Sequence, residues 1–267
     1  MPHISFSALK IWNDCPFKYK LQYIDKIKAF QGNPHTAFGT AMHDVCEQLI
    51  LGTCTLEESP EQFKKSFIRE FKSLPKEVTL NVDKKLIVDM SEQGTNLAPL
   101  AIPALEKKFG EFEVISSEEE LYEPIPEFEK EDMDFKGFVD LVIKTNDGKY
   151  HIIDWKTCSW GWDFKKKTDP MTTYQLTLYK HYLCLKHDLE PKNVETYFAL
   201  LKRTAKKDRV EIFKVTSGER KTKNALNLLN KALYNIVSDN HIKNRLSCSK
   251  CEFYKTKHCT WEVRRAR

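Results

Sequence analysis

One short segment carries an acid and a base two positions apart. Residues 152–157 read Ile-Ile-Asp-Trp-Lys-Thr, a strand-like stretch. In a strand, Asp154 and Lys156 point to one face of the sheet, while Trp155 points to the other and can join a core. The carboxylate can hold a divalent metal ion, and the ammonium can activate a water or stabilise charge on a phosphate. The pair suits phosphodiester hydrolysis, although an Asp-x-Lys pattern also arises often by chance.

A second acid lies in the preceding apolar segment. One carboxylate holds a magnesium ion poorly, because that ion takes several oxygen ligands. Asp140 sits alone in the otherwise apolar middle of residues 134–144, and Asn146-Asp147-Gly148 predicts a tight hairpin turn before residues 149–155. The hairpin can bring Asp140 close to Asp154. A lone acid in such a strand needs a partner or a metal.

Two predicted helices carry further candidates. Residues 37–51 read as a helix in which Gly39 permits close backbone approach and His43 follows one turn later. His43 can complete a metal site or contact a nucleic acid, although an isolated histidine is more often an ordinary core or surface residue. Gln175 and Tyr179 are four positions apart on a second helix, so their polar tips share one face.

The cysteines near the C-terminus have the spacing of metal ligands. Cys248, Cys251 and Cys259 form a Cys-x2-Cys-x7-Cys pattern, and the x2 spacing lets two thiolates meet one metal centre. Three thiolates need a fourth ligand, for which Cys15 is the candidate and the adjacent His258 is poorly placed. Four thiolates suit tetrahedral zinc as well as an iron–sulfur cluster, and spacing alone does not separate the two. The remaining cysteines are expected to be ordinary buried residues: Cys46, Cys54, Cys158 and Cys184.

The wider pattern predicts a mixed α/β layered fold with a mostly antiparallel sheet. Alternating and β-branched stretches predict strands at 112–123, 134–144, 149–155, 194–201 and 209–215. Helical spacing covers 37–51, 60–73, 83–109 with interruptions at Gly94, Pro99 and Pro103, 172–187 and 219–238. A first helix begins at a Ser5 or Ser7 cap and breaks at Pro16.

The composition limits the classes of protein to which this chain can belong. The chain has 267 residues, 41% hydrophobic and 30% charged, which allows one large domain with a packed core. No apolar run approaches the roughly 18–20 residues of a membrane span. No signal peptide is visible either, so we expect a cytoplasmic protein in which disulfides are unusual.

The charge pattern permits a nucleic-acid partner without requiring one. The net charge is +5, and the basic residues are locally dense. Lys165, Lys166, Lys167 and Arg203 are the candidates for DNA contacts, with solvated loops as the alternative. Glu118 and Glu120 share a face of a predicted strand, and Glu120 is the preferred site residue of the two, against the alternative of a solvated acidic edge.

Taken together, these motifs resemble the RecB-like nucleases of the PD-(D/E)XK superfamily. The resemblance rests on Gly39/His43, Gly137/Asp140, Asp154/Lys156/Thr157 and Gln175/Tyr179, and on an N-terminal segment from Ser7 to Asp25. It implies a restriction-endonuclease-like mixed β-sheet core flanked by helices, in a single domain over 1–267. Its parts would be N-terminal helices (1–51), a helical insertion (52–110), a catalytic core (111–217), and a C-terminal helix with the cysteine segment (218–267).

The resemblance also implies roles for the site residues. His43, Asp140 and Asp154 would bind Mg2+ or Mn2+, and Lys156 would act on water and phosphate. Gln175 and Tyr179 would orient the DNA or the lysine. Asp154 stands where Glu is common in the superfamily, which shortens the reach of that carboxylate by one methylene.

The four cysteines resemble those that hold a [4Fe-4S] cluster in the AddB nuclease domain and the CRISPR-adaptation nucleases. Cys15, Cys248, Cys251 and Cys259 match this pattern, and the cluster would join the N- and C-terminal segments as a structural staple. Zinc is the less favoured alternative.

We therefore expect a metal-dependent DNA nuclease, most readily an exonuclease that processes DNA ends, preferably single-stranded. Recombination, repair or a CRISPR-adaptation-like process, in a phage or a prokaryote, would be its setting. The sequence has no P-loop motif, so a helicase or recombination partner would be a separate protein, and an oligomer could form. The alternative is a non-catalytic iron–sulfur or zinc subunit that binds DNA and keeps a vestigial site.

Overall fold

The computed structural model describes residues 2–27 and 32–260, and these divide into two compact units. The described parts of Met1–Gln31, Pro124–Lys136 and Lys223–Arg267 form the first, here called the termini unit. Gly32–Glu123 and Gly137–Thr222 form the second, the sheet unit. The single nuclease domain expected over 1–267 stays a prediction.

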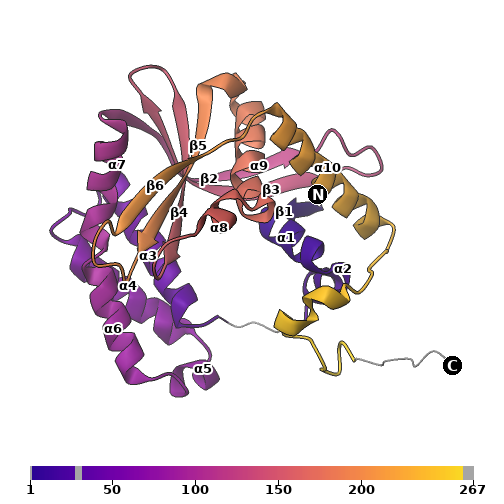
Figure 1. Ribbon diagram of the computed structural model, residues 1–267, viewed down its shortest axis with the longest axis horizontal. Helices are drawn as coiled ribbons and strands as arrows, with labels where there is room; N and C mark the ends of the chain where they lie inside the picture. The colour runs from indigo at the N-terminus through magenta and orange to yellow at the C-terminus, as the bar shows by residue number, and fades with distance from the viewer. Residues whose placement is uncertain (1, 28–31, 261–267) are drawn as a thin grey trace. The chain divides into compact units, whose positions relative to one another are not determined.

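The strands form one mixed sheet (Figure 1). Their bounds are β1 His3–Ser5, β2 Phe112–Pro124, β3 Asp134–Thr145, β4 Tyr150–Cys158, β5 Val194–Lys202 and β6 Val210–Val215. The order is β1-β3-β4-β5-β6, and β2 also pairs with β3. The mixed α/β prediction is confirmed, with five strands placed as expected and the short β1 unforeseen. The sheet is less antiparallel than predicted, because β4 pairs with β5 in parallel through a helical crossover.

The β3–β4 hairpin forms as its turn sequence predicts. Gly148 has a φ of +80°, a conformation that favours glycine, and the Thr145 N–H bonds to the Lys149 carbonyl at 3.0 Å. The antiparallel pairing runs from Lys144↔Tyr150 to Leu141↔Ile153. Asp140 therefore lies one position beyond the last paired residue.

The sheet unit also contains most of the helices. These are α3 Pro34–Ile50, α4 Ser59–Ser73, α5 Lys76–Leu80, α6 Lys84–Thr95, α7 Ala101–Phe109, α8 Phe164–Thr168 and α9 Pro170–His187, with short 3-10 turns at Ala98–Leu100 and Pro191–Asn193. Asn33 and Thr36 form a reciprocal capping box at the start of α3, which fixes where the helix begins. The short α5 and α8 were not predicted.

Residues 52–110 are helical, as expected, and they contribute to the main core of the unit. Phe63 and Phe67 of α4 lie in one hydrophobic cluster with Phe38 of α3, with the Phe38–Phe63 ring centroids 5.0 Å apart. The same cluster includes Trp155 of β4. Gly94 lies inside α6, where a Cβ would stand 2.0 Å from the Phe63 ring, so this glycine permits close packing of α6 on α4.

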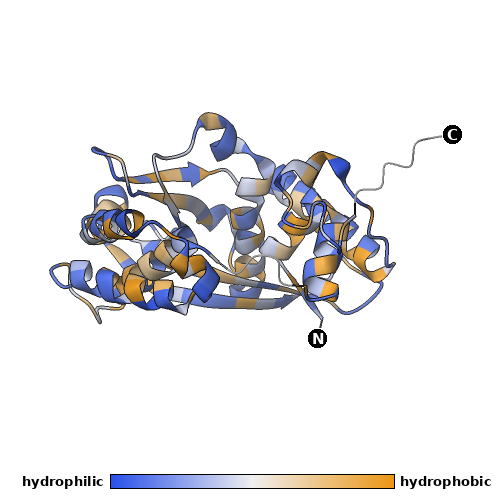
Figure 2. Ribbon diagram, turned by 90° about the horizontal axis from the view of Figure 1, so that it is seen from below, coloured by the Kyte–Doolittle hydropathy of each residue, from blue (hydrophilic) through white to orange (hydrophobic). Residues whose placement is uncertain are grey.

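The termini unit is mainly helical. It contains α1 Phe6–Asp14, α2 Pro16–Tyr19, the π-helix Lys20–Ile24, most of α10 Glu219–Val237 and the 3-10 helix Arg245–Lys250. Ser5 caps α1 and Pro16 opens a new helix, as the sequence predicts. Helices in both units show orange apolar and blue polar residues along their length (Figure 2), as amphipathic helices that cover a core should.

Candidate functional site

Asp154 and Lys156 lie side by side on β4. The Asp154 side chain is only 1% exposed, and the Lys156 ammonium forms an ion pair with its Oδ2 atom. Among the described residues, nothing donates a hydrogen bond to Oδ1. A buried carboxylate oxygen without a donor is costly, so this atom is available to a cation.

Asp140 reaches the same place from β3. Its Oδ2 atom accepts the main-chain N–H of Trp155 at 2.7 Å, which ties the acid to the strand that carries Asp154. The Nδ1 atom of His43 lies 3.5 Å from the same oxygen. His43 projects from α3, and one turn earlier a Cβ on Gly39 would stand 3.4 Å from the Thr157 hydroxyl. The close approach expected at Gly39 therefore places α3 against the end of β4.

Glu118 of β2 completes a group that could hold a metal ion. One ligand atom each from His43, Glu118 and Asp140 lie within 4.8 Å of one another. This group contains Glu118 instead of Glu120, because Glu118 has a φ of +49° and the strand does not alternate regularly there. Both glutamates are exposed, and the Glu120 carbonyl accepts a hydrogen bond from Lys186 at 2.8 Å.

The electrostatics of this group favour a cation. Burial raises the pKa of Asp140, and the nearby charge of Asp154 raises it further. Burial also raises the pKa of Glu118, as does Asp140. Burial and Lys156 lower the pKa of His43, which keeps its imidazole neutral and able to act as a ligand. Clustered acids beside a neutral histidine fit a divalent metal ion.

Lys156 stays charged in this setting. Burial works against its ammonium, but Asp154 and Asp140 outweigh that effect and raise its pKa. The Lys156 Nζ also lies 5.8 Å from the centre of the Phe198 ring on the neighbouring β5.

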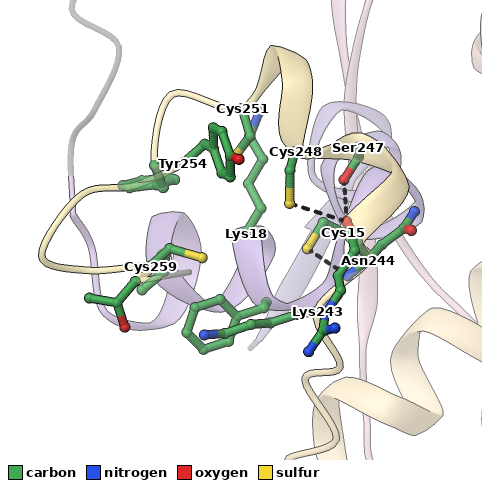
Figure 3. A pocket seen from close by; sticks show the side chains of 14 residues that line it. Cys15, Lys18, Lys243, Asn244, Ser247, Cys248, Cys251, Tyr254 and Cys259 are labelled. Carbon is green, nitrogen blue, oxygen red and sulfur yellow. Dashed lines mark hydrogen bonds between the residues drawn. The ribbon is translucent and has the colours of Figure 1, made fainter. Parts of the chain in front are cut away.

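The four cysteines predicted to bind one metal centre line a single cavity in the termini unit (Figure 3). The cavity measures about 190 Å³. Cys15 lies between α1 and α2, and its sulfur accepts the main-chain N–H of Asn244 at 3.3 Å. Cys248 donates to the Asn244 carbonyl at 3.8 Å, so one residue contacts cysteines from both ends of the sequence.

The other three cysteines also affect the protonation of Cys259. Burial raises the pKa of Cys259; Cys251, Cys248 and Cys15 add to this effect, and Lys243 opposes it. Yet within residues 2–27 and 32–260 no three cysteine sulfurs lie inside 4.8 Å of one another.

Comparison with known proteins decides the family. The model of the PD-(D/E)XK nuclease superfamily matches residues 3–256. The chain belongs to the PD-(D/E)XK nuclease superfamily. No curated protein sequence matches it.

One solved structure supports the same fold. The structure of a putative exonuclease from Eubacterium rectale aligns with a TM-score of 0.58 and 14% identity, covering 93% of this chain and 85% of that one. A structure of SSO0001 covers 94% of this chain and 83% of its own at 14% identity, with a TM-score of 0.43, too low to assign a shared fold. The observed sheet and flanking helices are consistent with the restriction-endonuclease-like fold of the superfamily.

Gln175 and Tyr179 lie together on α9, where the Gln175 amide donates to the Tyr179 hydroxyl at 3.3 Å. Burial raises the pKa of Tyr179 to about 12, so this hydroxyl keeps its proton. Asp154 raises the pKa of the Tyr179 hydroxyl and Lys156 lowers it, so α9 brings this hydroxyl near β4.

The expected DNA contacts of this nuclease fall into two groups. Lys165 and Lys166 are exposed on α8, beside Lys167, which forms an ion pair with Glu211. Arg203 instead binds within the protein, donating to Gln93 at 2.8 Å and to Ser159 at 3.1 Å.

None of the helices in the described part of the chain combines the length and apolar character that a membrane crossing requires.

Proposed function

We propose that this member of the superfamily is a metal-dependent DNA exonuclease that processes free ends, preferably single-stranded ones. The observation that carries the proposal is the joint placement of three acids, a neutral histidine and a charged lysine on β2, β3, β4 and α3. Recombination, repair or a CRISPR-adaptation-like process is the proposed setting. The Eubacterium rectale structure, described as a putative exonuclease, supports the choice of exonuclease.

His43, Glu118, Asp140 and Asp154 would hold Mg2+ or Mn2+. When bound, such an ion polarises the phosphodiester and lowers the pKa of a coordinated water. The His43 imidazole would offer its Nδ1 lone pair, since the ring is neutral. Asp154 would contribute its Oδ1 atom, to which no described group donates.

Lys156 and the α9 pair would act on the substrate. The Lys156 side chain is 30% exposed, and its ammonium can stabilise the negative charge that builds on the phosphate. Tyr179 remains a hydrogen-bond donor because its pKa lies near 12, and Gln175 orients its hydroxyl. These two side chains would steady the phosphate or the lysine during attack.

Linear and circular DNA test the exonuclease proposal. Protein purified without oxygen is incubated with end-labelled linear and circular single-stranded DNA, in Mn2+ or in EDTA. Metal-dependent loss of linear DNA with circles intact is the expected result. Cutting of circles would replace the exonuclease with an endonuclease, and loss of neither substrate would overturn catalysis.

We further propose that Cys15, Cys248, Cys251 and Cys259 hold a [4Fe-4S] cluster. Support comes from their convergence on one cavity in the termini unit. The Asn244 N–H that bonds to the Cys15 sulfur is typical of hydrogen bonds around such clusters. A ligated cluster would crosslink segments more than 200 positions apart, which constrains the unfolded chain.

Metal analysis separates the cluster from zinc. Anaerobically purified wild type should be brown and contain about four iron atoms per chain. Cys259→Ser should lose the colour, whereas Cys158→Ser, outside the cavity, should keep it. Stoichiometric zinc without iron would overturn the cluster.

A further inference from the structure

Two large aromatic side chains are exposed directly after the catalytic strand. Trp160 is 74% exposed and Phe164 is 80% exposed, both in the segment 159–168 that follows β4. Catalytic Lys156 precedes Trp160 by four positions, so their Cα atoms lie at most about 14 Å apart. Exposed rings this close to a catalytic lysine can contact a substrate bound there.

The base of this segment is fixed to the neighbouring strand. The Ser159 carbonyl accepts hydrogen bonds from the Thr204 N–H at 3.1 Å and the Thr204 hydroxyl at 2.7 Å. The Arg203 guanidinium donates to the Ser159 hydroxyl. Gly161 has a φ of +122°, a conformation that few other residues adopt, so the chain turns sharply between the two exposed rings.

The aromatic residue between the two exposed rings points inward. The ring of Trp162 packs edge-on against Phe198 at 5.1 Å and Phe213 at 6.1 Å between centroids. Phe198 is the ring beneath the Lys156 ammonium. Trp162 therefore anchors the segment next to the catalytic lysine, and the packing leaves Trp160 and Phe164 facing solvent.

The same segment is positively charged. Asp163 caps α8 by accepting the Lys166 N–H at 2.7 Å, which fixes the start of the helix that carries the lysines. The Lys166 ammonium lies 4.5 Å from the centre of the Trp162 ring. Lys165 is exposed on α8, so its charge is accessible to an anion.

We propose that Trp160 and Phe164 form a stacking platform for the bases of single-stranded DNA, with Lys165 and Lys166 contacting its phosphates. The inference rests on the proposed nuclease function and names the form of DNA that enters the site. Aromatic side chains interleaved with cations bind unpaired strands, because every base offers a face for stacking. In a duplex those faces are already stacked on neighbouring base pairs.

Binding to matched oligonucleotides tests the platform. Affinities for a single-stranded oligo(dT) and for an abasic strand of equal length are measured in EDTA, where no cleavage occurs. The wild type should bind oligo(dT) more tightly. Trp160→Ala and Phe164→Ala should each weaken oligo(dT) binding roughly 5- to 150-fold, the loss of one stacked base, and leave binding to the abasic strand unchanged.

Salt dependence distinguishes stacking from charge. Lys165→Ala should weaken binding to both strands and reduce the slope of log K against log salt by about 0.7, one phosphate contact. The aromatic variants should keep the wild-type slope. Leu80→Ala, which removes an apolar side chain 82% exposed on α5, is the matched control and should bind as the wild type does.

Two results would overturn the platform. They are unchanged oligo(dT) binding by both aromatic variants, and equal losses of affinity for the oligo(dT) and abasic strands. Base-dependent binding by a wild type that cleaves nothing in Mn2+ would support the platform while refuting the proposed nuclease. Cleavage without base-dependent binding would do the reverse.

Discussion

Removing the Lys156 ammonium should destabilise the protein in the absence of metal. Asp154 is 1% exposed, and Lys156 is the cation paired with it. A Lys156→Met substitution keeps most of the apolar stem and leaves a buried carboxylate without its counter-charge. Breaking a buried ion pair from one side typically costs about 3–5 kcal/mol, and the near-complete burial of Asp154 argues for that full range.

A double variant separates the charge effect from packing. Asp154→Asn combined with Lys156→Met removes both charges, so its loss of stability should be smaller than that of Lys156→Met by about 2 kcal/mol or more. Lys165→Met, on the exposed surface of α8, is the matched control and should change stability by less than about 0.5 kcal/mol.

Urea unfolding followed by circular dichroism in EDTA provides the assay. Saturating Mn2+ should restore part of the stability of Lys156→Met, because a bound cation replaces the lost charge and stabilises only the folded state. If Lys156→Met were as stable as the wild type, or no less stable than the double variant, the paired arrangement of Asp154 and Lys156 would be refuted.

Three further predictions concern packing, pH and metal. Gly94→Ala should lower the free energy of unfolding by about 1–3 kcal/mol, measured in urea, because the added Cβ would meet the Phe63 ring. This cost should outweigh the better helix propensity of alanine. A more stable variant would contradict the packing. Burial favours protonation of Glu195, but Lys214 leads the opposing effects and lowers its pKa to about 2. A lowered acid pKa stabilises the fold above the unfolded value near 4.3, and this contribution disappears as pH falls to about 2. Glu195→Gln should therefore lower the free energy of unfolding by about 1 kcal/mol at pH 6, a figure reduced for solvent screening, and should leave it unchanged near pH 2. An equal loss of stability at both pH values would refute the ion pair. His43→Ala should weaken Mn2+ binding at least about 10-fold by calorimetry, and unchanged affinity would remove His43 from the metal site.

The hairpin and the helix periodicity made much of the site predictable. Asn146-Asp147-Gly148 fixes how β3 and β4 pair, and that pairing predicts that Asp140 approaches Asp154. The three-residue β1 was missed, because so short a strand depends on pairing with β3 far along the sequence.

The parts that sequence could not supply depend on local backbone geometry and long-range contacts. Regular alternation places Glu118 and Glu120 on one face, and only the positive φ of Glu118 distinguishes them. A run of three consecutive glutamates does not show which of them adopts a positive φ. Arg203 stays a predicted DNA contact, and the sequence did not reveal its hydrogen bonds to Gln93 and Ser159, which lie 110 and 44 positions away.

Metal-dependent cleavage by wild type and by Asp154→Asn is the measurement that tests the central claim most directly. The substitution keeps the shape of the side chain and removes the charge proposed to hold the metal. We predict that Mn2+ supports release of nucleotides from linear single-stranded DNA by the wild type, that EDTA abolishes it, and that Asp154→Asn lowers the rate by about 1,000-fold or more, equivalent to about 4 kcal/mol. Undiminished cleavage by a folded Asp154→Asn protein would contradict the account.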